Sequence, residues 1–193
     1  MSFDTLINDI KHCALCANKL PLPPRPIIQA SKNARVLLIG QAPGLATHNK
    51  NLPFKDASGE RLRAWLEVTE SDFYNPQRFA IMPMAFCYPG KNSSGSGDKP
   101  PPAICSKTWH DDLLREMQNI KMTILIGRYA CNRYLPMYND LTQAIINQSI
   151  DHSDRVVLPH PSPRNNIWLK KNPWFETKTL PILRQRLQNI FEN

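Results

Sequence analysis

The sequence predicts an α/β protein, a three-layer α/β/α sandwich with a central four-stranded parallel sheet. Four short runs of aliphatic and β-branched residues recur along the chain, at 34–40, 78–84, 122–128 and 155–161. These runs hardly alternate with polar residues, which is typical of strands buried on both faces. Helical patterns lie between them, and this alternation favours a parallel sheet with helices on both sides. We expect one domain, 1–193, because a chain of this length can bury a single core and no linker divides it.

Apolar periodicity and capping residues predict the helices. In the first helix Ser2 is a candidate N-cap, and Phe3, Leu6, Ile7 and Ile10 share one face. The predicted helices are 2–11, 59–68, 108–120, one or two within 129–148 that break near Pro136, and 177–191.

Two further segments are predicted to be irregular. The proline-rich stretch 20–26 cannot form a helix, and we expect an extended strap there. The segment 90–102, GKNSSGSGDKPPP, is the most flexible piece by composition, although it is too short to separate domains.

The charge of the chain indicates a nucleic-acid partner. The formal net charge is +8 and the isoelectric point is about 9.4. A basic domain of this size often binds a polyanion, although a generally basic surface has the same composition. No apolar run reaches the roughly 18 residues that span a bilayer. The N-terminus, MSFDTLINDIKH, carries acids where a signal peptide is apolar. We therefore expect no membrane partner, a cytoplasmic location and a monomer.

The cysteines form a candidate metal site. In the cytoplasm thiols stay reduced, so ligands or buried thiols are expected rather than disulfides. Cys13 and Cys16 have two residues between them, a spacing at which both sulfurs reach one metal ion or cluster. Cys87 follows a predicted strand, and Cys105 comes just before a predicted helix, whose N-terminus stabilises a thiolate. Zinc suits the same four thiolates, and four free buried thiols are the alternative. We assign Cys131 to the core.

A binding site is expected in the loops that follow the strands, because active residues of parallel sheets gather at the carboxyl edge. Those loops carry GQAPG (40–44), PMAFCYPG (83–90), IGRYA (126–130) and HPSPRN (160–165). Two of the four are polar and constrained by proline, so that they direct backbone N–H groups outward.

Taken in order, these motifs resemble the uracil-DNA glycosylase superfamily. GQAPG (40–44) and the following NLPFKDASGERLRAWL (51–66) are similar to the first motif, and the segment after it, of the iron–sulfur branch often called family 4. The four cysteines match the [4Fe–4S] ligands of that branch in order and in rough spacing. HPSPRN (160–165) resembles the second motif of the superfamily, most closely that of the single-strand-selective monofunctional type. The resemblance spans 13–175.

The resemblance implies base excision, in which a damaged nucleotide is flipped out of DNA and its N-glycosidic bond is hydrolysed. His160 matches the histidine that stabilises the departing base, and the alternative is a core or capping histidine. Phe54 matches the aromatic ring that stacks on the flipped base, and the alternative is a core phenylalanine. The implied base and phosphate contacts are those of Gly40, Ala42, Pro43, Gly44, Phe54, Ser162, Arg164 and Asn165.

The same resemblance gives the loop that begins at Pro161 a role on DNA. In this loop Arg164 matches the arginine that pairs with phosphate and fills the gap left by the flipped base. The alternative is a solvated side chain. Lys170 and Lys171 follow, interleaved with Trp168 and Trp174 in a pattern that suits a DNA-facing segment. Both tryptophans also fit a core.

The sequence departs from the branch at two positions that bear on chemistry. Gln41 stands where the branch has glutamate, and an amide cannot act as a base. Pro83 stands where the branch has an asparagine that reads the uracil edge, whereas Ala42 fits the branch. Asp56 is the nearest candidate for the missing acid, with a helix-capping role as the alternative. His48 is a further residue that could face the site.

These features predict a monofunctional DNA glycosylase that acts on uracil or another deaminated base, with His160, Gln41 and Asp56 as catalytic candidates. The resemblance implies a [4Fe–4S] cluster on Cys13, Cys16, Cys87 and Cys105, with zinc as the other candidate occupant. The alternative function is a non-catalytic iron–sulfur module that binds DNA or senses damage on the same scaffold.

Overall fold

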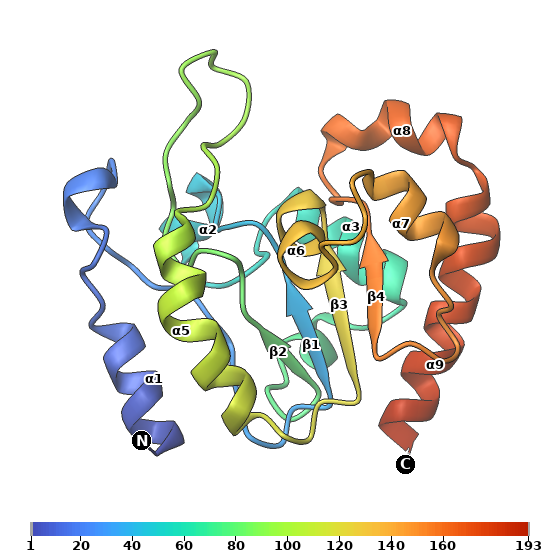
Figure 1. Cartoon of the computed structure of the whole chain (residues 1–193), viewed down its shortest axis with the longest axis horizontal. Helices are drawn as coiled ribbons and strands as arrows, with labels where there is room; N and C mark the ends of the chain where they lie inside the picture. Colours follow the sequence, from blue (N-terminus) through green and yellow to red (C-terminus); the bar gives the residue numbers. More distant parts are fainter. Residues whose placement is uncertain (1, 193) are drawn as a thin grey trace.

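The computed structural model describes residues 2–192 and confirms the predicted α/β class. In this part of the chain four parallel strands form one sheet in the order β2-β1-β3-β4 (Figure 1). The strands are β1 (Val36–Ile39), β2 (Phe79–Ile81), β3 (Met122–Ile126) and β4 (Arg155–Leu158). Nearly all of their residues are buried, as the unalternated apolar runs predicted.

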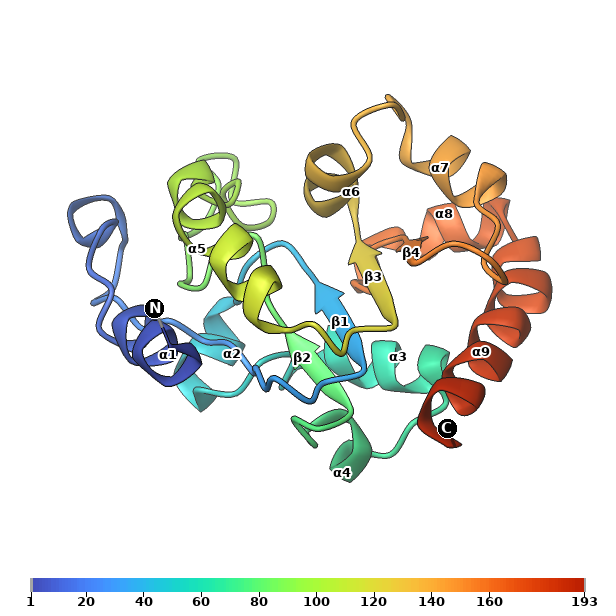
Figure 2. The ribbon, with the colours of Figure 1, turned by 60° about the horizontal axis from the view of Figure 1, so that its bottom comes forward.

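Helices cover both faces of the sheet. Because β2 and β3 lie on opposite sides of β1, right-handed connections place the β1–β2 crossover on one face and the later crossovers on the other. The first face carries α3 with α9, which pack against each other, and the second carries α5, α6 and α7, with α1 packed on α5 (Figure 2). The bounds are α1 (Phe3–Lys11), α3 (Ala57–Leu66), α5 (Ala103–Glu116), α6 (Arg128–Tyr134), α7 (Leu141–Asn147) and α9 (Leu180–Glu192).

The remaining elements are short, and none of the helices in residues 2–192 combines the length and apolarity needed to cross a membrane. They are α2 (Leu45–Lys50), α4 (Glu70–Phe73), α8 (Asn166–Lys171), 3₁₀ turns at Ala17–Lys19 and Pro163–Asn165, and a π-helical turn at Phe175–Thr179.

Helix α5 corrects one predicted boundary. The helix was expected over 108–120, but it begins at Ala103, directly after Pro102. Cys105 therefore lies in the first turn of α5 rather than before the helix. The apolar stripe from which the helix was predicted starts at Trp109, so periodicity alone missed the first turn.

The proline-rich strap leads into a segment that protects the edge of the sheet. Gln29 pairs antiparallel with Ile81 of the edge strand β2, and its side-chain amide donates to the carbonyl oxygens of Phe73 and Phe79. Ile27 donates its backbone N–H to the carbonyl of Phe86 at 2.8 Å. These bonds use the polar groups that an edge strand leaves open to other chains.

The segment that composition marked as most flexible folds into a hairpin. Lys91 and Asp98 form an antiparallel bridge, and Asn92 donates its N–H to the carbonyl of Gly97 at 2.9 Å. Gly95 and Gly97 have positive φ, which this tight turn requires. We call residues 90–99 the hairpin; it projects beyond the carboxyl end of the sheet (Figure 1).

A buried histidine connects α5 to the loop after β2. His110 is fully buried, and its Nε2 lies 3.0 Å from the carbonyl oxygen of Pro83. That nitrogen must carry the proton, so Nδ1 accepts a hydrogen bond from the Tyr134 hydroxyl at 2.6 Å. Burial lowers the pKa of His110 from 6.5 to about 4. The ring is therefore neutral near pH 7.

This neutral histidine should make folding sensitive to mild acid. Between pH 6.5 and about 4 the unfolded chain binds a proton at His110 that the folded chain does not. Stability therefore falls as the pH falls through this window, by up to about 3 kcal/mol. Urea unfolding of wild type and His110→Gln at a series of pH values tests this. The variant should be less stable at pH 7, and the difference should shrink towards pH 4. Parallel pH dependences of the two proteins would contradict the prediction.

Candidate active site

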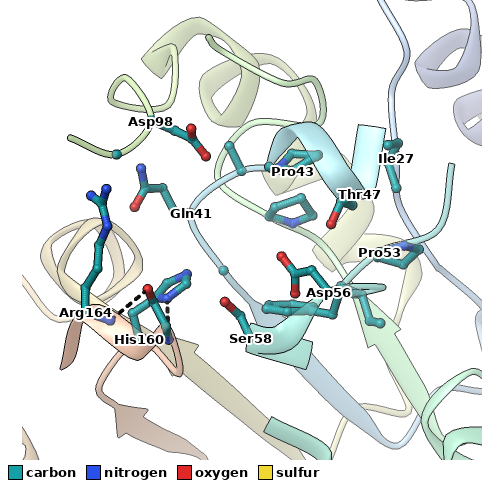
Figure 3. Close-up of a pocket in the computed structure, with 18 of the residues that line it drawn as sticks. Ile27, Gln41, Pro43, Thr47, Pro53, Asp56, Ser58, Asp98, His160 and Arg164 are labelled. Atoms are coloured by element: carbon teal, nitrogen blue, oxygen red, sulfur yellow. Dashed lines mark hydrogen bonds between the residues drawn. The ribbon is translucent and has the colours of Figure 1, made fainter. Parts of the chain in front are cut away.

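A pocket of about 340 Å³ opens at the carboxyl edge of the sheet. It lies beside the neighbouring strands β1 and β3. The chain that follows β1 crosses one face of the sheet and the chain that follows β3 crosses the other, and parallel sheets bind ligands at such a point. All catalytic and binding residues named from the sequence line it: Gly40, Gln41, Ala42, Pro43, Gly44, Phe54, Asp56, His160, Ser162, Arg164 and Asn165. The two motif loops therefore meet across one cavity (Figure 3).

His160 follows β4 and is held in one orientation. Its Nδ1 accepts the backbone N–H of Ser162 at 3.2 Å, and Asn165 Nδ2 donates to its carbonyl oxygen at 2.6 Å. Because Nδ1 is the acceptor, the neutral ring carries its proton on Nε2. Among residues 2–192 Nε2 has no hydrogen-bond partner, so this N–H is available to a ligand.

Charge and close packing also act on this ring. Burial lowers the pKa of His160, while the carboxylates of Asp56 and Asp98 act in the opposite direction. Gly127 lies against the ring, and a Cβ there would be 3.5 Å from the His160 Cβ. With φ at +79°, Gly127 also occupies a backbone conformation that side chains rarely adopt. The site therefore holds a neutral imidazole with one free donor.

Phe54 forms a wall of the pocket in an unusual conformation. Its φ is +53°, which is rare for a bulky residue and is found where surrounding structure enforces it. The ring tip lies 3.0 Å from the position of a Cβ on Gly40, and the ring packs edge-on against Phe73 at 6.2 Å. The carbonyl of Phe54 accepts from Arg63 at 3.4 Å. Phe54 thus contacts the core and also lines the cavity.

Asp56 combines the two roles that the sequence left open. Its Oδ1 accepts the backbone N–H of Gly59 at 2.9 Å, so it is the N-cap of α3. Its Oδ2 faces the first motif, 4.0 Å from the position of a Cβ on Gly44. One oxygen therefore stabilises the helix while the other is directed at the pocket.

Asp98 and Lys91 line the pocket and were not identified from the sequence. Both belong to the hairpin, and Lys91 Nζ lies 3.3 Å from Asp98 Oδ1. That oxygen is buried and, in the described chain, makes no contact with hydrogen-bond geometry. No motif marked these residues, and their segment had the composition of a flexible loop. The spacing of a lysine and an aspartate on either side of a Gly-Ser turn was the one available signal.

Arg164 lies between the pocket and the hairpin. A Cβ on Gly97 would be 2.2 Å from Arg164 Nη1, so the guanidinium packs directly on the hairpin backbone. The tryptophans after it are structural, because Trp168 and Trp174 pack edge-on at 5.9 Å and Trp168 Nε1 donates to Thr142. Lys170 and Lys171 remain accessible to solvent.

His48 does not face the site, contrary to one of the expectations above. It is buried in α2, its carbonyl accepts from Arg25 at 2.9 Å, and its ring faces Tyr88 at 6.2 Å. Pro83 does line the pocket, but its carbonyl oxygen is used by His110. Neither residue supplies a side-chain polar group to the cavity.

The four named cysteines line a second, apolar cavity together with the proline strap. Cys13 and Cys16 come from the turn after α1, Cys87 from the loop after β2, and Cys105 from the first turn of α5. Burial raises the pKa of Cys87 to about 11 and that of Cys105 to about 12. Without a cation nearby these two thiols are neutral and unreactive. Cys131 is buried in the core, as expected.

Backbone N–H groups donate to two of the cysteine sulfurs. Phe86 donates its N–H to Cys105 Sγ at 3.3 Å, and the backbone of Arg25 donates to Cys87. Such N–H···S bonds stabilise thiolates around iron–sulfur centres. Within residues 2–192 no three His, Cys, Asp or Glu side chains are close enough to share one metal ion.

Comparison with known proteins finds a matching family and similar solved structures. A model of the uracil DNA glycosylase superfamily matches residues 28–184. This range includes all the pocket residues named from the sequence, and Cys87 and Cys105, but neither Cys13 nor Cys16. The chain is also similar to a solution NMR structure of "a putative Uracil DNA glycosylase from Methanosarcina acetivorans", with 16% identity, a TM-score of 0.49, and coverage of 85% of this chain and 98% of that chain.

Gly59 should be essential for the position of Phe54. A Cβ at Gly59 would lie 1.7 Å from the carbonyl oxygen of Phe54, so Gly59→Ala must displace backbone. We expect a loss of roughly 1–3 kcal/mol or more in urea unfolding, as for overpacked cores. The neighbouring, exposed Ala57→Ser is the control and should cost less than about 0.5 kcal/mol. A Gly59→Ala protein as stable as wild type would show that Phe54 is not held by this contact.

Proposed function

The chain belongs to the uracil DNA glycosylase superfamily, and on that premise we propose that it is a monofunctional DNA glycosylase that removes uracil or another deaminated base from DNA. The observation that carries the proposal is the free Nε2–H of His160, held in the pocket by the Ser162 N–H on the opposite ring nitrogen. At about 340 Å³ the pocket falls within the range of small-molecule sites and has room for one flipped base.

His160 supports the chemistry by stabilising the leaving group. When the N-glycosidic bond breaks, its electron pair leaves with the base, and negative charge develops on a base carbonyl oxygen. A neutral imidazole donating from Nε2 stabilises that charge without first giving up a proton. Burial, which lowers the pKa of His160, keeps the ring in this neutral form near pH 7.

The other walls of the pocket supply binding. Phe54 offers a ring face on which a base can stack, an interaction worth about 1–3 kcal/mol. Gln41 donates from its Nε2 to the carbonyl of Lys99 at 3.4 Å, and its amide oxygen can accept a hydrogen bond from a base N–H. Arg164, with Ser162 at the start of its turn, is placed to contact the DNA backbone. Because Pro83 has no polar side chain, base selection rests on Gln41, His160 and backbone groups.

The lysine in the pocket supports a monofunctional enzyme. Schiff-base chemistry requires an uncharged amine. Lys91 is more than half exposed, and its Nζ is engaged in a salt bridge with the carboxylate of Asp98 at 3.3 Å. The abasic product is therefore expected to keep its strand intact until alkali is added.

We expect wild-type protein to release a base from oligonucleotides that contain uracil, hypoxanthine or xanthine, read as strand cleavage after alkali. His160→Ala should slow single-turnover release by about 10²–10³ because the leaving base loses its donor. The exposed His152→Ala is the matched control and should behave as wild type.

Three results, from this assay or from borohydride trapping on the same oligonucleotides, would count against the proposal. Tight binding to these oligonucleotides without release of any base would favour a DNA-binding or damage-sensing module, for which Gln41 and Pro83 are the motivating departures. Borohydride trapping of a covalent protein–DNA complex would contradict the monofunctional chemistry. Full activity of His160→Ala would remove the catalytic role of that residue.

We also propose that Cys13, Cys16, Cys87 and Cys105 hold a [4Fe–4S] cluster. The support is their shared apolar cavity and the two N–H···S donors beside it. When bound, the cluster would cross-link the turn after α1, the loop after β2 and α5, in a cavity that His160 does not line. The cluster is thus proposed to stabilise the fold and not to take part in base release.

Anaerobically purified protein should be brown, with broad absorption near about 400 nm. Cys105→Ser should remove colour and iron and lower the unfolding midpoint, because metal binding energy is folding energy. Cys131→Ser, a buried cysteine outside the cavity, is the matched control and should keep the colour. Colourless wild-type protein with one zinc per chain would overturn the cluster.

A further inference from the structure

The hairpin brings an additional carboxylate to the pocket. Lys91 and Asp98 are opposite each other in its ladder, and Lys99 closes it by donating to the carbonyl of Gly90 at 2.8 Å. On such a ladder, side chains of paired residues lie on the same face. That face is the one directed at the cavity, because both residues line it. Figure 3 shows the carboxylate of Asp98 at this cavity.

Contacts on two sides keep the hairpin in place. Gln41 of the first motif donates to the carbonyl of Lys99 at 3.4 Å, and Arg164 of the second motif packs on Gly97. The hairpin therefore bridges the two motif loops. Asp98 lies between these two anchors, and its position does not depend on its own hydrogen bonds.

Asp98 keeps one carboxylate oxygen, Oδ2, outside its salt bridge with Lys91. Its Oδ2 lies 3.6 Å from the position of a Cβ on Gly44, close to the point that Asp56 Oδ2 approaches at 4.0 Å. Its Oδ1 is buried and forms a salt bridge with Lys91 Nζ at 3.3 Å, but it accepts no hydrogen bond in the described chain. Oδ1 is therefore held by the charge of Lys91 rather than by a hydrogen bond, and Oδ2 is the oxygen that a ligand or water can reach.

We propose that Asp98 is the base that activates the attacking water in this enzyme; the inference rests on the glycosylase function proposed above. As the bond between the sugar C1′ and the base nitrogen breaks, its electron pair leaves with the base. The water oxygen then forms a bond to C1′, and one water proton passes to the Asp98 carboxylate and from there to solvent. The carboxylate also stabilises the positive charge on the sugar.

Asp98 suits this role better than the two residues named from the sequence. Gln41 has an amide, which does not accept a proton near neutral pH. Asp56 uses Oδ1 to cap α3, so part of its capacity is committed to the fold. Asp98 caps no helix, and within the part of the chain that the structure describes Lys91 is its one salt-bridge partner.

The test compares wild type, Asp98→Asn, Asp98→Ala and Asp112→Asn in single-turnover base release. Asp112 is an exposed acid on α5 away from the pocket, so its variant makes the same charge change and should keep wild-type activity. Asp98→Asn should lower the rate constant by about 10²–10⁴ at saturating enzyme, with little change in DNA affinity. The low-pH limb of the rate profile should flatten, and added formate or azide should partly restore Asp98→Ala.

Each other outcome has a separate meaning. If wild type releases no base from any substrate, the glycosylase function fails and this inference with it. If wild type is active and Asp98→Asn stays within threefold of it, only the role of Asp98 is overturned. A slow Asp98→Asn whose pH profile keeps its shape, with no rescue of Asp98→Ala, would also overturn it, because a structural defect has those properties. Thermal melting confirms that each variant is folded.

Discussion

All four strands of the sheet run in the same direction, and the arrangement of the pocket follows from that constraint. Parallel strands bring their carboxyl ends to one edge, so loops far apart in the sequence meet there. Gln41 follows β1, and His160 follows β4. The connections after β1 and β3 leave on opposite faces of the sheet and diverge. The pocket lies beside this point and is lined by the loops after β1, β2 and β4, so its polar groups come from segments that a buried, rigid sheet positions.

The sheet positions the polar groups, but the aromatic wall depends on a strained turn. Phe54 adopts a positive φ, which costs about 1–3 kcal/mol for a residue of this size. Gly59 allows the backbone of α3 to approach the Phe54 carbonyl, and Arg63 donates to the same oxygen. Packing of the ring on Phe73 offsets the strain. Asp56, which caps the same helix, is brought to the pocket by the same turn.

The fold was largely predictable from the sequence because buried parallel strands and amphipathic helices leave periodic apolar patterns. The pocket residues in the two motifs were found for the same reason, since the loops that follow strands share an edge. Asp98 was not found, because its position results from a hairpin with the composition of a flexible loop. His48 was wrongly considered for the site, since no pattern tells which face of the short helix α2 is buried. The start of α5, and with it the helical position of Cys105, lay outside the apolar stripe.

The cysteine cavity and the pocket are connected by the chain between them. Cys87 and Cys105 stand on either side of the hairpin, and Gln41 and Arg164 hold it at the pocket. Fixing both ends of a connecting segment removes loop-closure entropy that would otherwise oppose its ordering. A cluster bound at these two cysteines would therefore favour the ordered hairpin, and with it the placement of Asp98. The proposed cluster would thus have no chemical part in base release, and its effect would be limited to the conformations of the segment that carries the carboxylate.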